Sequence, residues 1–89
     1  MTYRYYIGSN NKTGRLEDKK AIKAISDQFE GFTAFKGLGY WQGKSEKTLI
    51  VEIETENKNK VLLLAKRLAK TLNQQAIGVL QVGRMSFVS

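Results

Sequence analysis

The stretch that decides the fold is residues 31–56, GFTAFKGLGYWQGKSEKTLIVEIETE. It begins with strand-forming side chains at residues 32–35, and over residues 48–54 every second side chain is apolar. That period of two is typical of a strand with one buried face. Between these parts, glycines surround an aromatic pair that includes Trp41. The stretch therefore predicts a strand, a glycine-rich loop over roughly residues 36–47, and a second strand.

Amphipathic helices are predicted on both sides of this hairpin. The first covers residues 17–29 and carries its apolar side chains on one face, at Ala21, Ile22, Ile25 and Phe29. The second begins after the capping residue Asn57, and its apolar stripe consists of Val61, Leu64, Ala65, Leu68 and Leu72. Leu62 and Leu63 widen that stripe beyond what one sheet face needs, so a contact with another subunit stays open.

Short strands are predicted near both ends of the sequence. Residues 3–7 alternate, with Tyr3, Tyr5 and Ile7 on one face and Arg4 and Tyr6 on the other. Residues 76–82 form the last predicted strand, and residues 84–88 extend it or add an edge strand. The order β-α-β-β-α-β predicts an α+β protein of the ferredoxin-like class, an antiparallel sheet with two helices on one face. We expect residues 1–89 to form a single domain.

Composition narrows the classes of function. The 89 residues carry 15 Lys plus Arg against 8 Asp plus Glu, a formal charge of +7, which either attracts anions or only confers solubility. Without cysteine or histidine, the sequence has no disulfide, no thiolate nucleophile and no imidazole base or metal ligand. No apolar run matches a membrane span or signal peptide. We therefore expect a cytoplasmic protein that is not an enzyme and needs no cofactor.

The turn after the first predicted strand is a candidate anion-binding loop. Residues 8–14, GSNNKTG, are turn formers whose backbone amides are flanked by Lys12 and Arg15. They do not match the Walker pattern for phosphate binding, so a simple turn remains the alternative. Arg4 and Tyr6 on the adjacent strand offer a further phosphate and base contact, or a subunit interface.

Three carboxylates, Glu52, Glu54 and Glu56, share one face of the third predicted strand. Same-face neighbours on a strand lie about 7 Å apart, which is too far for a single metal ion without ligands from elsewhere. Neighbouring basic side chains explain these residues equally well. We therefore predict neither a metal site nor a catalytic carboxylate pair here.

Residues 39–53, GYWQGKSEKTLIVEI, resemble the characteristic turn of CutA proteins in the PII-like superfamily. In that turn an aromatic residue precedes a tryptophan, a basic or polar residue, a glycine and a lysine, and acidic residues then lead into an apolar strand. The resemblance also covers the order of elements along the chain. It implies a trimer of ferredoxin-like subunits packed through their sheets, with small-ligand clefts between neighbours.

In PII-type members such clefts hold adenine nucleotides or related signals, and a projecting loop contacts partners. This sequence departs from the family in three respects. Its loop is shorter than the PII loop, it has no cysteine or histidine for a copper site, and residues 73–78 do not match the glycine-lysine segment that contacts phosphate. A role in copper tolerance is therefore not expected.

The candidate ligand-binding residues lie mainly in the predicted loop. Its glycines let a backbone approach a ligand closely, its lysines supply charge, and one aromatic ring stacks on a base. The candidates are Lys36, Gly37, Gly39, Tyr40, Trp41, Gly43, Lys44 and Arg84. The alternatives are that the glycines only bend a hairpin and that the aromatic pair packs in the core or a subunit interface.

The sequence thus favours a PII/CutA-like homo-oligomer, with a trimer favoured, that binds an anionic small molecule in clefts between subunits. A nucleotide or nucleotide-derived signal is the expected ligand, and the output is sensing or sequestration. One alternative is a nucleic-acid-binding module that uses the sheet or the lysine-rich helices, with strongly salt-dependent binding. Another is an inhibitor that acts through protein interaction.

Overall fold

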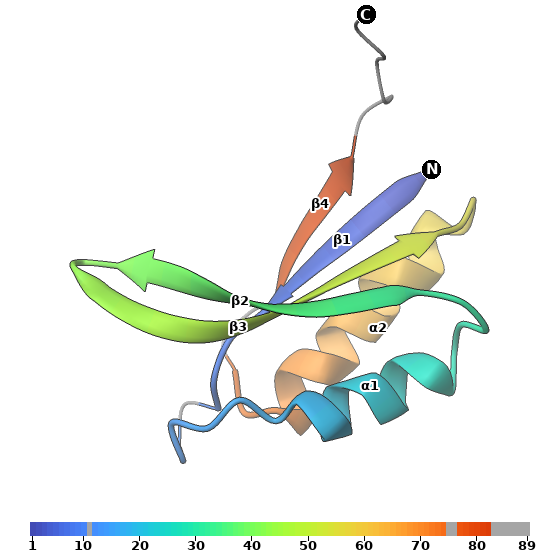
Figure 1. Ribbon diagram of the computed structural model, residues 1–89. Helices are drawn as coiled ribbons and strands as arrows, with labels where there is room; N and C mark the ends of the chain where they lie inside the picture. The colour runs from blue at the N-terminus through green and yellow to red at the C-terminus, as the bar shows by residue number, and fades with distance from the viewer. Residues whose placement is uncertain (11, 75–76, 83–89) are drawn as a thin grey trace, which may run out of the picture.

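The computed structural model describes residues 1–10, 12–74 and 77–82. These residues form four strands and two helices in the predicted order (Figure 1). The elements are β1 (Thr2–Ile7), α1 (Asp18–Ser26), β2 (Thr33–Trp41), β3 (Lys44–Glu54), α2 (Lys58–Thr71) and β4 (Gly78–Val82). No helix within the described ranges is long and apolar enough to cross a membrane.

The strands of the described residues form one antiparallel sheet in the order β2-β3-β1-β4. Strands β1 and β3 are central, and Tyr5 pairs with Val51 of β3 and with Val79 of β4. Both helices lie on the same side of the sheet (Figure 1). The predicted ferredoxin-like class is therefore confirmed.

The core lies between that side of the sheet and the helices. Because β1 and β3 alternate in phase, Tyr3, Tyr5 and Ile7 face the helices together with Leu49, Val51 and Ile53. The helices contribute Ala21, Ile25, Val61, Leu64, Ala65, Leu68 and Leu72. The predicted apolar stripe of the second helix is thus confirmed residue by residue, while Leu62 and Leu63 are exposed.

Local chemistry sets the helix ends. The Asn57 side chain accepts a hydrogen bond from the backbone amide of Lys60 at 3.0 Å, as expected of a helix cap. Helix α1 is shorter than predicted, since it ends at Ser26 with Asp27 as its C-terminal cap. Phe29 nevertheless stays buried, and the Lys60 ammonium lies 4.7 Å from the centre of its ring.

The glycine-rich loop predicted over residues 36–47 is instead a continuation of the sheet. Strands β2 and β3 stay paired from Thr33 opposite Glu52 to Trp41 opposite Lys44. The chain reverses through Gln42 and Gly43, whose φ angles of 50° and 77° fit the two-residue turn that matches strand twist. The projection is therefore a curved two-stranded arm that extends beyond the helices (Figure 1).

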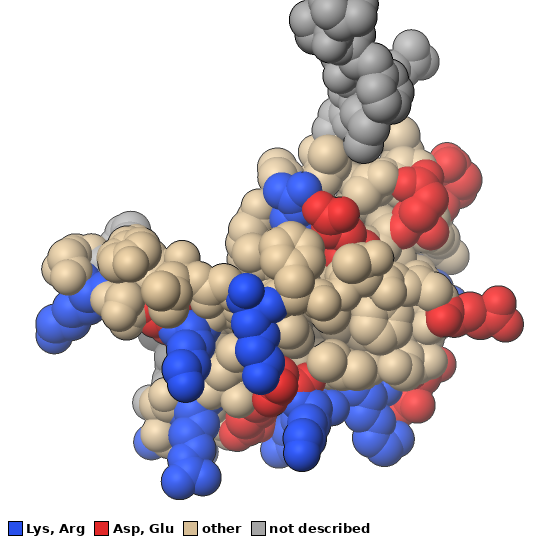
Figure 2. Space-filling model, in the orientation of Figure 1, with Lys and Arg blue, Asp and Glu red and all other residues tan. Residues whose placement is uncertain are grey.

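The outer face of the sheet carries a row of apolar side chains. The strand register places Phe35, Ile50 and Tyr6 side by side across β2, β3 and β1. Beside this row, the Arg4 side chain donates to Glu52 and, at 3.2 Å, to the Tyr6 hydroxyl. Uncharged side chains dominate this face, while lysine and arginine side chains lie along its lower margin and the arm (Figure 2). No element among the described residues covers it.

The buried Tyr5 hydroxyl donates a 2.6 Å hydrogen bond to the Val61 carbonyl in the first turns of α2, and burial raises the pKa of Tyr5. We expect Tyr5→Phe to lower the free energy of unfolding by about 1 kcal/mol, because this bond ties the central strand to the helix. Urea denaturation measures the change. Tyr3→Phe on the same strand face is the control, since the Tyr3 hydroxyl has no partner among the described residues. Equal losses in both variants would contradict this role of the bond.

The arm depends on a turn that requires two positive φ angles, and asparagine tolerates this conformation better than glutamine. We expect Gln42→Asn to raise the free energy of unfolding by about 0.5 kcal/mol. Gln42→Val should lower it by roughly 1 kcal/mol, because a β-branched side chain resists positive φ. Chemical denaturation of the three proteins gives the order. A valine variant as stable as the asparagine variant would rule out this turn.

Candidate functional site

A groove of about 1000 Å³ lies between the connection from β1 to α1 and the base of the β2-β3 arm. It is formed by two regions that are far apart in the sequence, the β1–α1 connection and the β2-β3 hairpin. Its lining residues are Ser9, Gly14, Arg15, Leu16, Asp18, Lys36, Gly37, Leu38, Ser45, Glu46 and Lys47. In Figure 1 the connection to α1 runs beneath the arm, and Figure 2 shows lysine and arginine side chains along this lower margin.

The charges that line the groove are mostly positive. Arg15, Lys36 and Lys47 supply three cations against the carboxylates of Asp18 and Glu46. The Lys36 ammonium lies 3.0 Å from the Asp18 carboxylate, and its hydrogen bond lowers the pKa of Asp18. Arg15 and Lys47 form no ion pair with any residue that the structure describes. These two cations are therefore available to an anionic ligand.

Asn10 organises the loop that carries Arg15. Its side chain is only 2% exposed and accepts hydrogen bonds from the backbone amides of Lys12 at 2.8 Å and Thr13 at 3.2 Å. Its amide group donates to Glu17 at 2.8 Å. The Asn10 backbone also pairs with the Arg15 carbonyl at 2.8 Å. The loop is thus closed on itself, which holds Arg15 at the margin of the groove.

A second set of contacts fixes the peptide unit between Gly8 and Ser9. The Gln74 side chain donates to the Gly8 carbonyl at 2.5 Å, and the Ser9 amide donates to the Glu46 carboxylate at 2.8 Å. A Cβ at position 8 would lie only 2.7 Å from the Glu46 carboxylate oxygen, so the missing side chain of Gly8 leaves room for Glu46 to approach. The arm and the end of α2 therefore both hold the wall of the groove.

The structure brings only part of the predicted site together. Lys36 and Gly37 line the groove. The backbone of the remaining hairpin candidates lies further out along the arm, and of these Gly39, Tyr40, Gly43 and Lys44 do not line the groove. These outer positions are Gly39, Tyr40, Trp41, Gly43 and Lys44. Tyr40 is 72% exposed. Arg84 lies outside the described residues. A ligand role for the outer positions stays a prediction.

Several groove residues were not predicted from the sequence. The sequence indicates Arg15 only as a residue that flanks a candidate anion-binding loop. It gives no signal that Asp18, Glu46 and Lys47 belong to a site. The signal for the loop was present in its Gly-Ser-Asn turn, because asparagine often binds backbone amides two or three residues ahead. The Glu46 contact spans 37 positions in the sequence and had no local signal.

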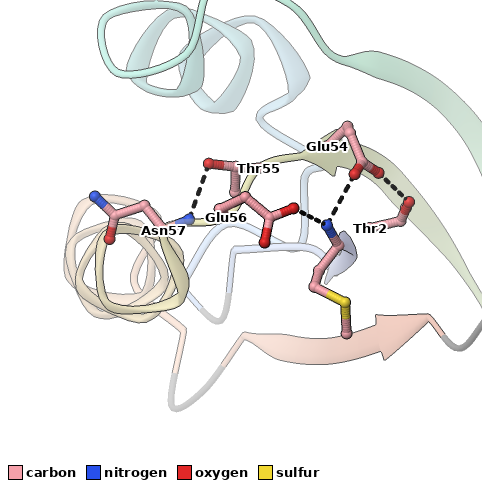
Figure 3. A network of polar contacts seen from close by, with 6 residues as sticks. Thr2, Glu54, Thr55, Glu56 and Asn57 are labelled. Atoms are coloured by element: carbon pink, nitrogen blue, oxygen red, sulfur yellow. Dashed lines mark hydrogen bonds and ion pairs between the residues drawn. The ribbon is translucent and has the colours of Figure 1, made fainter.

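The three carboxylates predicted to share one strand face lie at the C-terminal end of β3 and just beyond it, since β3 ends at Glu54, and they are engaged elsewhere. Glu52 pairs with Arg4, while Glu54 and Glu56 accept hydrogen bonds from the Met1 ammonium at 2.8 and 2.9 Å (Figure 3). The ammonium and Thr2 hydrogen bonds lower the pKa of Glu54. None of these side chains lines the groove.

The Asp18–Lys36 pair gives the groove a measurable pH dependence. Because the folded pKa of Asp18 is lowered, the pair stabilises the fold above the unfolded pKa of about 3.9 and loses this effect as pH falls through the folded value. We expect Lys36→Ala to raise the Asp18 pKa toward its ordinary value in an NMR titration of the carboxyl group. Lys44→Ala, which removes a cation further out on the arm, should leave the Asp18 pKa unchanged. A pKa that moves equally in both variants would contradict the specific pair.

No protein-family model matches the chain, and no curated protein matches it in sequence. Solved structures do match. A phage SAM lyase in the apo state has a TM-score of 0.60 at 20% identity, over 88% of this chain and 75% of that chain. The divalent cation tolerance protein CutA1 of Thermus thermophilus has a TM-score of 0.55 at 14% identity, over 97% and 88%. A CutA1 variant of Pyrococcus horikoshii scores 0.51 at 14% identity, over 94% and 86%.

The comparison with the phage protein corrects one expectation. The absence of cysteine and histidine led us to expect that the chain is not an enzyme, but the highest TM-score of these three belongs to a lyase. The fold thus occurs in an enzyme, and the absence of cysteine and histidine is not a sufficient reason to exclude catalysis. The CutA1 structures bear out the resemblance at the level of the fold, since the chain has the CutA-like form of the ferredoxin-like fold.

Proposed function

We propose that the protein is a homo-oligomer that binds an anionic small molecule, a nucleotide or nucleotide-derived signal, in the groove between the loop that follows β1 and the base of the arm. The observation that carries this proposal is the pair of cations, Arg15 and Lys47, which line one groove without an ion pair among the described residues. Phosphate groups bind such sites through charge-assisted hydrogen bonds.

The uncovered face of the sheet supports the oligomer. Phe35 and Leu80 are exposed there at 46% each, and the neighbouring Tyr6 at 37%. Apolar side chains on a sheet face without a covering layer favour burial against another subunit. We propose a trimer that packs through this face, in which the outer part of one arm, with Tyr40 and Lys44, reaches the groove of its neighbour and completes it.

A second candidate function is cleavage of SAM, S-adenosylmethionine, and the likeness to the phage SAM lyase favours it. SAM combines an adenosine, a sulfonium cation and an amino acid, so its site needs acceptors for cations as well as a donor for a carboxylate. The groove offers both, because the carboxylates of Asp18 and Glu46 and the cations of Arg15 and Lys47 line it. Both candidates share an adenosine-type ligand and differ in whether the ligand is changed.

Native mass spectrometry of the purified protein tests the oligomer and any retained ligand together. We expect a trimer. Its free energy of unfolding should rise by about 2.7 kcal/mol at an ADP or SAM concentration one hundred times the Kd, and thermal denaturation detects this change. Mass spectrometry of the ligand pool then separates binding from cleavage. A trimer that retains ADP unchanged supports sensing or sequestration in the cytoplasm, whereas loss of SAM supports the lyase.

Variants locate the site. We expect Arg15→Ala and Lys47→Ala each to weaken ADP binding about tenfold, because each removes one charge-assisted contact. Lys70→Ala is the matched control, since Lys70 is an exposed cation in the last turn of α2. Calorimetric titration measures the three affinities. A monomer without ligand, strongly salt-dependent binding of nucleic acid, or capture of a protein with no small ligand would each contradict the proposal.

A further inference from the structure

We propose that the Ser9 backbone amide and the Arg15 side chain form a phosphate subsite, and that the Glu46 carboxylate occupies the amide part of this subsite until a ligand phosphate displaces it. The inference rests on the proposed function and names the part of the groove that takes the anion. It also gives Glu46 a role, as an internal competitor that sets how tightly anionic ligands bind.

The first argument is the identity of the group that the Ser9 amide binds. Its acceptor, at 2.8 Å, is a carboxylate oxygen from a strand 37 residues away. A backbone N–H that already holds one anionic oxygen has the donor and the surroundings that another anionic oxygen needs. The absent side chain at Gly8 makes room for that oxygen, because a Cβ there would lie 2.7 Å from it.

The second argument is that the donor is held in place independently of Glu46. The Gly8 carbonyl and the Ser9 N–H belong to one peptide unit, and Gln74 binds the carbonyl end at 2.5 Å. Since the peptide unit is planar, fixing its oxygen also limits where its N–H points. Asn10, which is buried, closes the loop on the following side. The N–H therefore keeps its orientation when the carboxylate leaves.

The third argument is that Glu46 can be displaced. Its side chain is exposed and forms no ion pair with a described residue, so a rotation of the side chain releases the amide while β3 stays paired. A ligand phosphate regains the same hydrogen bond and adds the charges of Arg15 and Lys47, which line the same groove. While it remains in the groove, the Glu46 carboxylate repels that phosphate.

The test compares binding of inorganic phosphate and of ADP by the wild-type protein, Glu46→Ala and Glu46→Gln. Isotope-edited NMR follows the Ser9 amide, and calorimetry measures Kd. We expect Glu46→Ala to bind both probes about tenfold more tightly than the wild type, with a shift of the Ser9 resonance on binding. Glu46→Gln keeps an acceptor oxygen without the charge, so it should fall between them and also guards against misfolding of the alanine variant.

Two further variants complete the design. Glu56→Ala removes the same charge from a side chain that is 89% exposed and does not line the groove, so its affinities should stay within about twofold of wild type. Gln74→Ala should weaken ADP binding, because the peptide unit loses its other support. Equal or weaker binding by both Glu46 variants would overturn the subsite, as would binding of ADP at Arg15 without a change at Ser9. If no protein binds ADP or phosphate, the proposed function itself fails.

Discussion

Burial of one apolar face, formed jointly by β1 and β3, is the constraint on which the rest of this structure depends. Tyr5 pairs with Val51, so that both strands present their large apolar side chains to the same side. The two helices close over that side, and no element among the described residues covers the other side. The side of the sheet that the helices cover decides which residues form the core, which face stays open, and where the loop after β1 emerges.

The features set by periodicity were predictable from the sequence. The period of two in residues 48–54 and the apolar stripe from Val61 to Leu72 both match the structure. When the apolar side chains of a strand or helix lie on one face, only one orientation of that element buries them. The arm was not predicted correctly. Glycines usually signal a loop, but here Gly37 and Gly39 lie inside a strand, where a Cβ at Gly39 would approach the Thr48 hydroxyl at 3.0 Å. Close packing across the ribbon therefore outweighed local propensity.

The candidate site was predictable only in part, for a different physical reason. Lys36 and Gly37 were found because they sit next to a conspicuous motif, and both line the groove. Glu46 and Gln74 were not found, since each acts on the Gly8–Ser9 peptide across a long sequence separation. Such contacts depend on how the arm curves over the loop, and curvature is a property of the assembled sheet. Counting charges predicts an anionic ligand, but it does not predict which residues line the groove.

The position of β2 at the margin of the sheet has a consequence for how the protein behaves in a crowded solution. One side of β2 pairs with β3, and its other backbone side has no strand partner among the described residues. A long edge strand with unpaired backbone groups can pair with other copies and form fibrils. In β2 this edge carries a charge at Lys36 and residues of low strand propensity at Gly37 and Gly39. We therefore expect these residues to disfavour pairing of β2 with the same strand of another copy.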